Sequence, residues 1–402
     1  MNIASCKHES YAPLRSEYDE ELTLLRQRDD FSEEFEYFLQ VLAAGIDPDE
    51  FKSKYTKQLV GLACVQAPFE LIDALGFHSF RMRCGSLSMH ETATHLPSLA
   101  CPVIKSCLGH SCAAGSPENS CALTVVPTTC DWTVKLPELL RKAEDKIHIM
   151  DLPHLKQNER GRKRWLEEVY ELKKVLEQKS GKKLSRRELM NSIGKYADAW
   201  DAWGRLVEAR RQRKISGVWF LVLANAFLQD DAKSWTEGAN AVLSACRQPV
   251  ATTRPAIFLA GSPISFPNLK IMRLIEDAGM DIVADELCTS ERVFVGAPVY
   301  DDTSEYGLLK SLSEKYHLAC TCPTFADNER RIRNVLATMR DHNITGVVYH
   351  VLKGCHPYDI ECAGFEKAIK KAGFHFTKIE TDFSSEDEKQ ILVRLEAFKE
   401  LF

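Results

Sequence analysis

The sequence predicts an α/β protein with two Rossmann-like, doubly wound parallel-sheet domains related by pseudo-duplication, together with N-terminal helices and a helical insert. Short, continuous apolar runs alternate with helical patterns, which is typical of parallel strands covered on both faces. This order occurs twice along the chain, and a stretch of long, Lys- and Arg-rich helical patterns separates the two copies. The length, 402 residues, fits two or three domains of about 150 residues each.

The changes of pattern set the expected boundaries. We predict an N-terminal helical segment at 1–57, a first Rossmann-like domain at 58–154, a basic helical insert at 155–250 and a second Rossmann-like domain at 251–402. The pseudo-duplication rests on the parallel between VGLAC–APFELIDALG–FHSFRMRC and IFLAGSP–NLKIMRLIEDAG–MDIVADELC. We interpret the charge of the insert as a solvated helical face, and the alternative is a docking surface for an acidic partner.

The first half of the chain divides into alternating elements. Residues 1–57 are helical, with Ser32 as a suitable N-cap for a helix with one apolar face. The first domain contains a strand ending near Cys64, a helix over 68–75 closed by Gly76, a strand ending at Cys84, an irregular stretch at 91–120, a strand leading into the loop 128–131, a helix at about 132–145 and a strand at 147–153. In the insert, Ser185 and Glu188 form a capping box.

The second domain repeats the alternation. Its predicted elements are a strand at 255–263, a helix at 268–280 capped by Asn268, a strand at 281–288, helices at about 305–316 and 328–341, a strand at 346–355, a helix at 359–373, a strand at 374–382 and a terminal helix that opens with Ser385 and Glu388 as a capping box. The continuous apolar strands indicate that helices cover both faces of this sheet as well.

Composition and charge exclude several functions. Hydrophobic residues make up 45% and charged residues 27%, as in an ordinary globular protein. The net charge is -5 and no basic motif interleaved with aromatic residues occurs, so we expect no nucleic-acid partner. No apolar run approaches the roughly 18 residues of a membrane span. The polar N-terminus has no apolar core for a secretion signal, so we expect a cytoplasmic protein that does not bind a membrane.

The chain carries 14 cysteines, and several fall where ligands bind in an α/β fold. A long chain without a secretion signal does not need disulfides, so its cysteines serve packing, metal binding or redox chemistry. Ligands bind at the carboxyl ends of parallel strands, and two facing domains would gather thiolates there. The cysteines at predicted strand ends are Cys64, Cys84, Cys130, Cys288 and Cys355, and those in the following loops are Cys101, Cys107, Cys320 and Cys322.

Thiolates are soft ligands that hold iron–sulfur clusters or zinc. No C-x-x-C pair occurs, so a local zinc knuckle is disfavoured and an interdomain metal centre is favoured. The alternative for any one cysteine is that it is a small buried hydrophobe. We favour that interpretation for Cys6, Cys246 and Cys362, and leave Cys107, Cys112 and Cys121 undecided.

Several stretches resemble the 2-hydroxyacyl-CoA dehydratase / benzoyl-CoA reductase family, the D-component-type proteins, and its double-cubane cluster protein branch. They include GLACVQAPFELIDALGF, LACPVIKS, VVPTTCDW, DELCTS and YHVLKGCHPYDIE. The resemblance implies that two Rossmann-like domains bind an oxygen-sensitive iron–sulfur cluster, as in anaerobic enzymes. It also implies an ATP-hydrolysing iron–sulfur activator as electron donor, and a homodimer.

The resemblance also implies ligands. A [4Fe–4S] cluster would take Cys101, Cys130 and Cys355. The double-cubane branch holds an [8Fe–9S] centre, for which we expect Cys64, Cys288 and Cys322 as the second trio, with Cys84 and Cys320 as reserves. The stretch GHSCAAG around Cys112 departs from the usual family pattern.

Three functional hypotheses follow. The first is an ATP-dependent reductase of a small molecule, with His110, Lys353 and His356 as candidate proton or hydrogen-bond donors. The second is a 2-hydroxyacyl-CoA dehydratase or aryl-CoA reductase subunit with one [4Fe–4S] cluster. The third is an iron–sulfur carrier, a chaperone or sulfur-trafficking protein, or a cluster-free binding module. No G-x-G-x-x-G loop or Walker lysine occurs, so we assign ATP to the activator.

Overall fold

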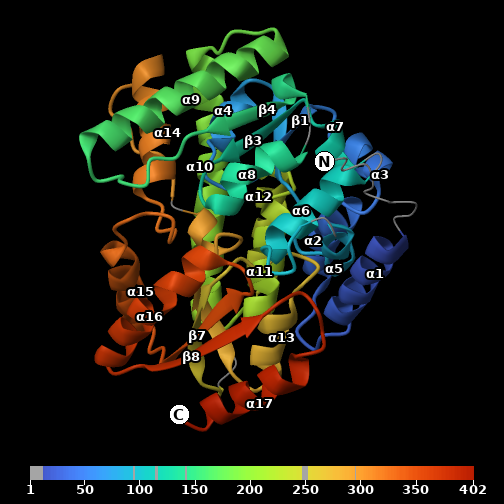
Figure 1. The fold of residues 1–402 in the computed structure, drawn as a ribbon, viewed down its shortest axis with the longest axis vertical. Helices are drawn as coiled ribbons and strands as arrows, with labels where there is room; N and C mark the ends of the chain where they lie inside the picture. The colour runs from blue at the N-terminus through green and yellow to red at the C-terminus, as the bar shows by residue number, and fades with distance from the viewer. Residues whose placement is uncertain (1–11, 94–95, 114–115, 141–142, 247–251, 295) are drawn as a thin grey trace.

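The computed structural model describes residues 12–93, 96–113, 116–140, 143–246, 252–294 and 296–402. Its two sheets lie one above the other along the long axis of the molecule (Figure 1). The first sheet consists of β1 (Gln58–Leu62), β2 (Phe77–Arg81), β3 (Leu123–Pro127) and β4 (Ile147–Met150). The second consists of β5 (Ala256–Gly261), β6 (Asp281–Asp285), β7 (Gly346–Leu352) and β8 (His375–Thr381).

The two sheets have the same topology. The strand order is β2-β1-β3-β4 in one and β6-β5-β7-β8 in the other, and every pairing is parallel. All residues of β3 and β7 are buried, which explains why these strands read as continuous apolar runs. The structure therefore confirms the predicted α/β class with two Rossmann-like halves.

Helices connect and cover the strands. The N-terminal segment forms α1 (Ala12–Arg26), α2 (Glu33–Ala44) and α3 (Pro48–Lys54). The first half contains α4 (Phe69–Ala74), α5 (Leu87–Thr92), α6 (Pro102–Cys112), α7 (Pro117–Ser120), α8 (Asp131–Leu140) and the 3-10 turn Glu144–Lys146. The insert contains α9 (Glu159–Ser180), α10 (Arg186–Arg211), α11 (Gly217–Phe227) and α12 (Ala232–Ala245). The second half contains α13 (Lys270–Asp277), the 3-10 turn Glu291–Val293, α14 (Glu305–Leu318), α15 (Glu329–Asp341), α16 (His356–Lys371) and α17 (Glu388–Lys399).

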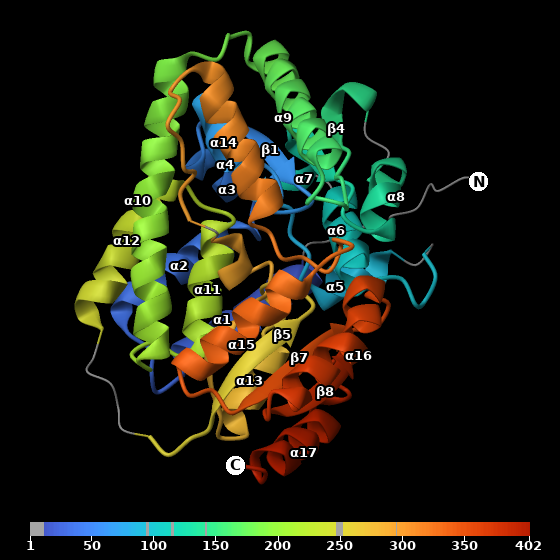
Figure 2. The same ribbon diagram turned by 90° about the vertical axis from the view of Figure 1, so that its left-hand side faces the viewer.

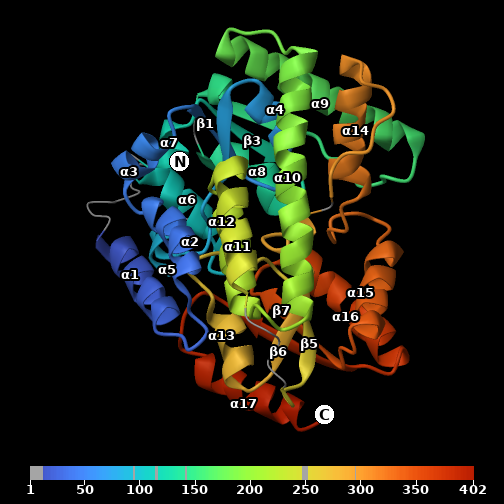
Figure 3. The ribbon, with the colours of Figure 1, turned by 180° about the vertical axis from the view of Figure 1, so that it is seen from behind.

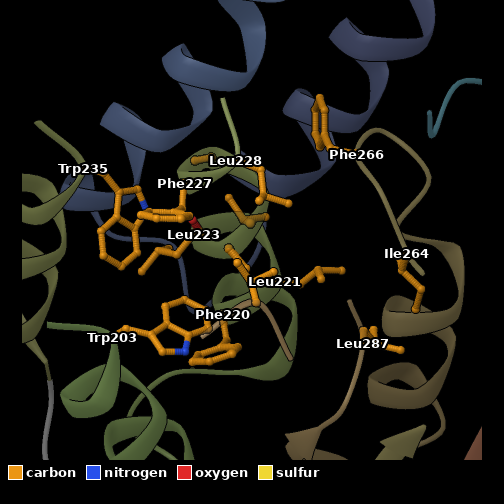
Figure 4. Packing of buried hydrophobic residues seen from close by; sticks show 14 of the residues in the cluster. Trp203, Phe220, Leu221, Leu223, Phe227, Leu228, Trp235, Ile264, Phe266 and Leu287 are labelled. Carbon is orange, nitrogen blue, oxygen red and sulfur yellow. The ribbon is translucent and has the colours of Figure 1, made fainter. Parts of the chain in front are cut away.

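The insert spans the length of the molecule (Figure 3), and one of its helices, α11, is completely buried. From behind, α10 extends along both sheets, and it contacts α4 beside the first sheet and β6 in the second (Figure 3). Every residue of α11 is buried. Its aromatic side chains pack with Trp203 of α10 and Trp235 of α12 (Figure 4). One continuous hydrophobic core thus joins the N-terminal helices, the insert and both sheets.

Helix α14 follows the second sheet's β6 in the chain but lies beside the first sheet, next to α9 (Figure 2). A buried ion pair between Lys315 Nζ and Glu70 Oε1, 2.6 Å long, attaches α14 to α4. The Tyr316 hydroxyl donates to the other oxygen of Glu70 at 2.7 Å. The loop after α14, with Cys320 and Cys322, is thereby brought to the first half of the chain.

The stretch 91–120 was predicted to be irregular, and that prediction is wrong, because α6 and α7 form there. Pro102 opens α6, where its missing N–H would have no intrahelical partner in any case. Gly, Ser and Cys form helices weakly, but nearly all of α6 is buried. Tertiary packing, rather than local propensity, therefore stabilises this helix.

Two predicted caps are wrong as well. Asn268 does not cap α13, because its side-chain amide donates to Phe383 O at 3.1 Å and the helix begins later, after Leu269. Ser385 and Glu388 do not form a capping box, because Asp387 is the N-cap of α17. Ser32 does precede α2, though without a side-chain cap hydrogen bond.

The capping box at Ser185 and Glu188 is confirmed at the start of α10. Gly76 follows α4, one residue beyond its C-cap Leu75. Among the described helices, none has the length and apolar character needed to cross a membrane.

Candidate metal centre

Three cysteines from both halves of the chain meet at one place, which we call the first thiol set: Cys101, Cys130 and Cys355. Cys101 lies before α6, Cys130 follows β3, and Cys355 follows β7 of the second sheet. The Cys101 thiol hydrogen-bonds to the Cys355 sulfur, which raises the pKa of Cys101 and lowers that of Cys355. Burial raises the pKa of Cys130, and the Cys355 charge acts in the same direction.

Close backbone packing brings these loops together. Gly354 has a φ of 82°, and a Cβ on it would overlap the carbonyl oxygen of Leu99, two residues before Cys101. Gly85 packs in the same way on the backbone of Ser265 and Phe266. In both places a glycine of one half lies directly on the chain of the other half, so the two lobes approach more closely than side chains would allow.

Each thiol of the first set lies at the start of a helix. Cys101 is the N-cap of α6, Cys355 is the N-cap of α16, and Cys130 directly precedes α8. The backbone N–H three residues further on opposes the rise in the pKa of Cys101 and Cys130 and contributes to the lowered pKa of Cys355; these groups belong to Ile104, Thr133 and Tyr358. Helix N-termini carry partial positive charge, so all three favour thiolates here.

Five of the other strand-end and loop cysteines form a second thiol set: Cys64, Cys84, Cys288, Cys320 and Cys322. Burial raises the pKa of Cys288 to about 12, and the charges of Cys64 and Cys84 act on it too. The charge of Cys320 raises the pKa of Cys322, and the charge of Cys64 raises the pKa of Cys320. This set, like the first, therefore draws thiols from both halves of the chain.

Two guanidinium groups face the second thiol set. Arg292, in the 3-10 turn after Cys288, is buried, and its charge opposes the effect of burial on the pKa of Cys288 and Cys320. The half-buried Arg81, at the end of β2, interacts with Cys84, Cys64 and Cys288. Positive charge at this distance favours thiolates over thiols.

Tyr358 links the two sets. Its backbone N–H acts on the Cys355 sulfur, and its phenol oxygen accepts a hydrogen bond from Arg292 Nη1. The phenol also lies within electrostatic range of Cys288 and Cys322. A further bridge is the hydrogen bond that the Thr324 hydroxyl donates to Thr129 O. The two thiol sets are thus neighbours within one interlobe region.

The donor chemistry fits an iron–sulfur group. Within the described part of the chain, no three His, Cys, Asp or Glu side chains are arranged around a single metal ion. The ligands of an iron–sulfur cluster each bind a different iron, so such a cluster does not need three side chains that converge on one ion. Arg292 Nε is buried without a hydrogen-bond partner among these residues, as is the whole side-chain amide of Gln66, two residues after Cys64. Buried polar groups normally have partners, so both fit an additional group at this place.

The predicted proton donors lie in different environments. His110 is fully buried in α6 and interacts with Glu118. Lys353 is half-exposed, and its ammonium pairs with Asp382 at 2.8 Å. His356 is exposed at the first position of α16, directly after Cys355. Of these, only His356 is adjacent in the chain to a thiol of the two sets.

The remaining cysteines lie elsewhere or serve packing. Cys362 belongs to a hydrophobic cluster of the second half, and Cys246 is the C-cap of α12. Cys121 is buried and donates to Pro117 O at 3.1 Å. Cys107 and Cys112 lie on α6, and Cys6 is outside the described residues.

Sequence reasoning missed Arg81, Arg292, Tyr358 and Gln66. The arginines stand close to cysteines in RMRC and CTSER, and the need to balance several buried thiolates could have identified them. Tyr358 and Gln66 gave no local signal, because their importance comes from tertiary packing.

The sequence matches the model of a family described as 2-hydroxyglutaryl-CoA dehydratase, D-component, over residues 64–402. It is 26% identical to YjiM of Escherichia coli K12, a proposed dehydratase subunit, over 85% of this chain and 91% of the relative. It is 24% identical to the beta subunit of (R)-2-hydroxyglutaryl-CoA dehydratase of Acidaminococcus fermentans, over 69% and 74%. It is 22% identical to the beta subunit of lactoyl-CoA dehydratase of Anaerotignum propionicum, over 88% and 94%. The chain therefore belongs to the 2-hydroxyglutaryl-CoA dehydratase D-component family.

Proposed function

We propose that this protein is an iron–sulfur enzyme in which the two thiol sets hold a double-cubane [8Fe–9S] centre, which receives low-potential electrons from an ATP-hydrolysing activator and reduces a small molecule. The observation that carries the proposal is the second thiol set. A single [4Fe–4S] cluster needs only Cys101, Cys130 and Cys355, but further thiols from both halves lie beside them with two arginines.

In this proposal each trio of cysteines would bind one half of the centre. Cys101, Cys130 and Cys355 would hold one half of the centre, and Cys64, Cys288 and Cys322 the other. When bound, the group supplies one-electron chemistry at a potential set by charge, hydrogen bonds and exposure. The three helix N-termini and the two guanidiniums stabilise the anionic thiolates, and close packing of the lobes keeps water away from them.

The second candidate is a subunit of a 2-hydroxyacyl-CoA dehydratase or aryl-CoA reductase, with a single [4Fe–4S] cluster on the first thiol set. The names of two relatives, both beta subunits of CoA dehydratases, favour it. In that case the thiols of the second set would bind no iron, and the subunit would work with a partner chain.

Iron and sulfide quantification on anaerobically purified protein separates the two. Near eight irons per chain supports the double cubane, and near four supports the dehydratase subunit. In Cys64→Ser and Cys322→Ser we expect about half of the iron to be lost, with the other half kept. Cys121→Ser is the matched control, because Cys121 is buried and hydrogen-bonds to Pro117 O. A change of the EPR spectrum on adding an acyl-CoA would favour the dehydratase subunit, and a colourless protein would contradict both candidates.

A further inference from the structure

Arg81 carries a positive charge that no carboxylate balances. Its Nη1 donates to Leu62 O at 3.0 Å, and no described Asp or Glu forms an ion pair with it. The charges that act on it most strongly are those of Cys84, Cys64 and Cys288. A half-buried guanidinium without a carboxylate partner is unfavourable unless another anion lies beside it.

Arg292 is a second guanidinium near the same thiols, and its charge acts on Cys288 and Cys320. Its Nη2 lies 3.1 Å from Glu286 Oε2, but Glu286 is also bound by Arg331. Arg292 Nε has no hydrogen-bond partner among the described residues, although the side chain is only 3% exposed. Part of the Arg292 charge is therefore not neutralised by Glu286, and its Nε–H remains available to a group bound by the second thiol set.

The first thiol set is built differently. Its sulfurs face the N-termini of α6, α8 and α16. Each N-terminus supplies only about half of an elementary charge, shared with the rest of the helix end. The second set has full guanidinium charges in a poorly solvated place, where charge acts more strongly. The two halves of the site thus differ in how well each accommodates added negative charge.

We propose that Arg81, assisted by Arg292, raises the reduction potential of the part of the centre held by Cys64, Cys288 and Cys322, so that an added electron resides there. Each one-electron reduction, by the activator or by a chemical reductant, adds one negative charge and breaks no bond. A fixed positive charge stabilises the reduced state and makes the potential more positive. This inference rests on the proposed function, and it assigns Arg81 and Arg292 as positioning residues.

The test is a redox titration of the anaerobically purified, iron-loaded full chain, followed by EPR, with titanium(III) citrate as reductant. Arg81→Gln should make the midpoint of the first reduction more negative at an unchanged iron content. Arg81→Lys keeps the charge and should restore the midpoint. Arg292→Gln is the second variant and should shift it in the same direction. Arg333→Gln removes an equal charge from the exposed face of α15, where Arg333 is 68% exposed, and should leave the midpoint unchanged.

The outcomes are distinguishable. An unchanged midpoint in fully loaded Arg81→Gln and Arg292→Gln would overturn the inference, as would an equal shift in Arg333→Gln. Loss of iron from both variants would overturn it too, because the arginines would then hold the group rather than tune it. Wild-type protein with near four irons or none refutes the double cubane itself, independently of the arginines.

Discussion

The backbone of Gly354 lies directly against the carbonyl oxygen of Leu99, so that Cys355 of one lobe stands beside Cys101 of the other. Gly354→Ala adds a Cβ that overlaps this oxygen and places an alanine at a φ of 82°. We expect the free energy of unfolding to fall by at least about 1–3 kcal/mol, the usual cost of such a backbone conformation. Iron bound by the first thiol set should fall as well.

Gly181→Ala is the matched control for Gly354→Ala, because Gly181 has a φ of 68° and no atom within 4 Å of an added Cβ. It should show the backbone cost alone and leave iron content unchanged. Anaerobic urea unfolding and iron assay measure both quantities. Equal losses in the two variants would mean that the contact with Leu99 has no role of its own.

Lys315→Met tests the attachment of α14. Among the described residues, it leaves the buried Glu70 carboxylate with the Tyr316 hydroxyl as its side-chain partner. Breaking a buried pair in this way lowers the free energy of unfolding by about 3–5 kcal/mol. Because α14 leads to Cys322, we expect the iron of the second thiol set, half of the total, to be lost or labile. Thermal unfolding and iron assay measure the two effects.

Lys173→Met removes another ion pair of α14, to Glu305 at 2.6 Å, which is more exposed. This substitution should lower the free energy of unfolding by no more than about 1 kcal/mol. If Lys315→Met behaved like Lys173→Met, the buried pair would not be what places α14.

The lowered pKa of buried His78 leads us to expect that the stability of the protein depends on pH. It is buried, its ring stacks on Tyr55 at 3.8 Å, and burial lowers its pKa to about 4. The unfolded chain binds a proton near pH 6.5, whereas the folded chain stays neutral down to about 4. The contribution of neutral His78 to the free energy of unfolding is therefore complete above pH 6.5. It decreases as the pH falls, and at pH 5 it is smaller by on the order of 2 kcal/mol.

His78→Gln should reduce the difference in melting temperature between pH 7.5 and pH 5.5, although it lowers both values by disturbing the core. His375→Gln, at an exposed position, should keep the wild-type difference. An undiminished difference in His78→Gln would show that His78 is not neutral in the folded protein.

The reserve cysteines give a further prediction. Cys84 Sγ lies 3.4 Å from Ser265 Oγ, and we expect Cys84→Ser to keep this contact and the full iron content. Cys320→Ser should keep its iron too, because the Cys320 carbonyl, which accepts from Lys156, is unaffected. Loss of half the iron from either variant, as from Cys322→Ser, would move that cysteine into the ligand set.

Local sequence patterns predicted the strands well, because β3 and β7 are buried along their whole length and consist mostly of apolar residues. They failed where a tertiary contact competes for a local group. The Asn268 amide bonds to Phe383. The N-cap position of α17 is taken by Asp387, whose carboxylate binds Lys270 and makes no cap hydrogen bond. Neither contact can be inferred from residues close in sequence.

The candidate site shows the same division. The topology of a duplicated α/β fold places cysteines such as Cys130 and Cys355 at strand ends, so their location could be predicted. The route of α14 to the first sheet could not, since it depends on the buried pair of Lys315 with Glu70. The charges of Arg81 and Arg292 also went unnoticed, because the sequence does not show which of 52 basic residues face a thiol.

The complete burial of α11 has a consequence for how the chain can be divided. This helix contacts α2 of the N-terminal segment, α10 and α12 of the insert and β6 of the second sheet, and its Phe227 packs against Phe69 of the first half. A fragment that lacked α11 would therefore expose apolar surface of the N-terminal helices, the insert and the second sheet at the same time.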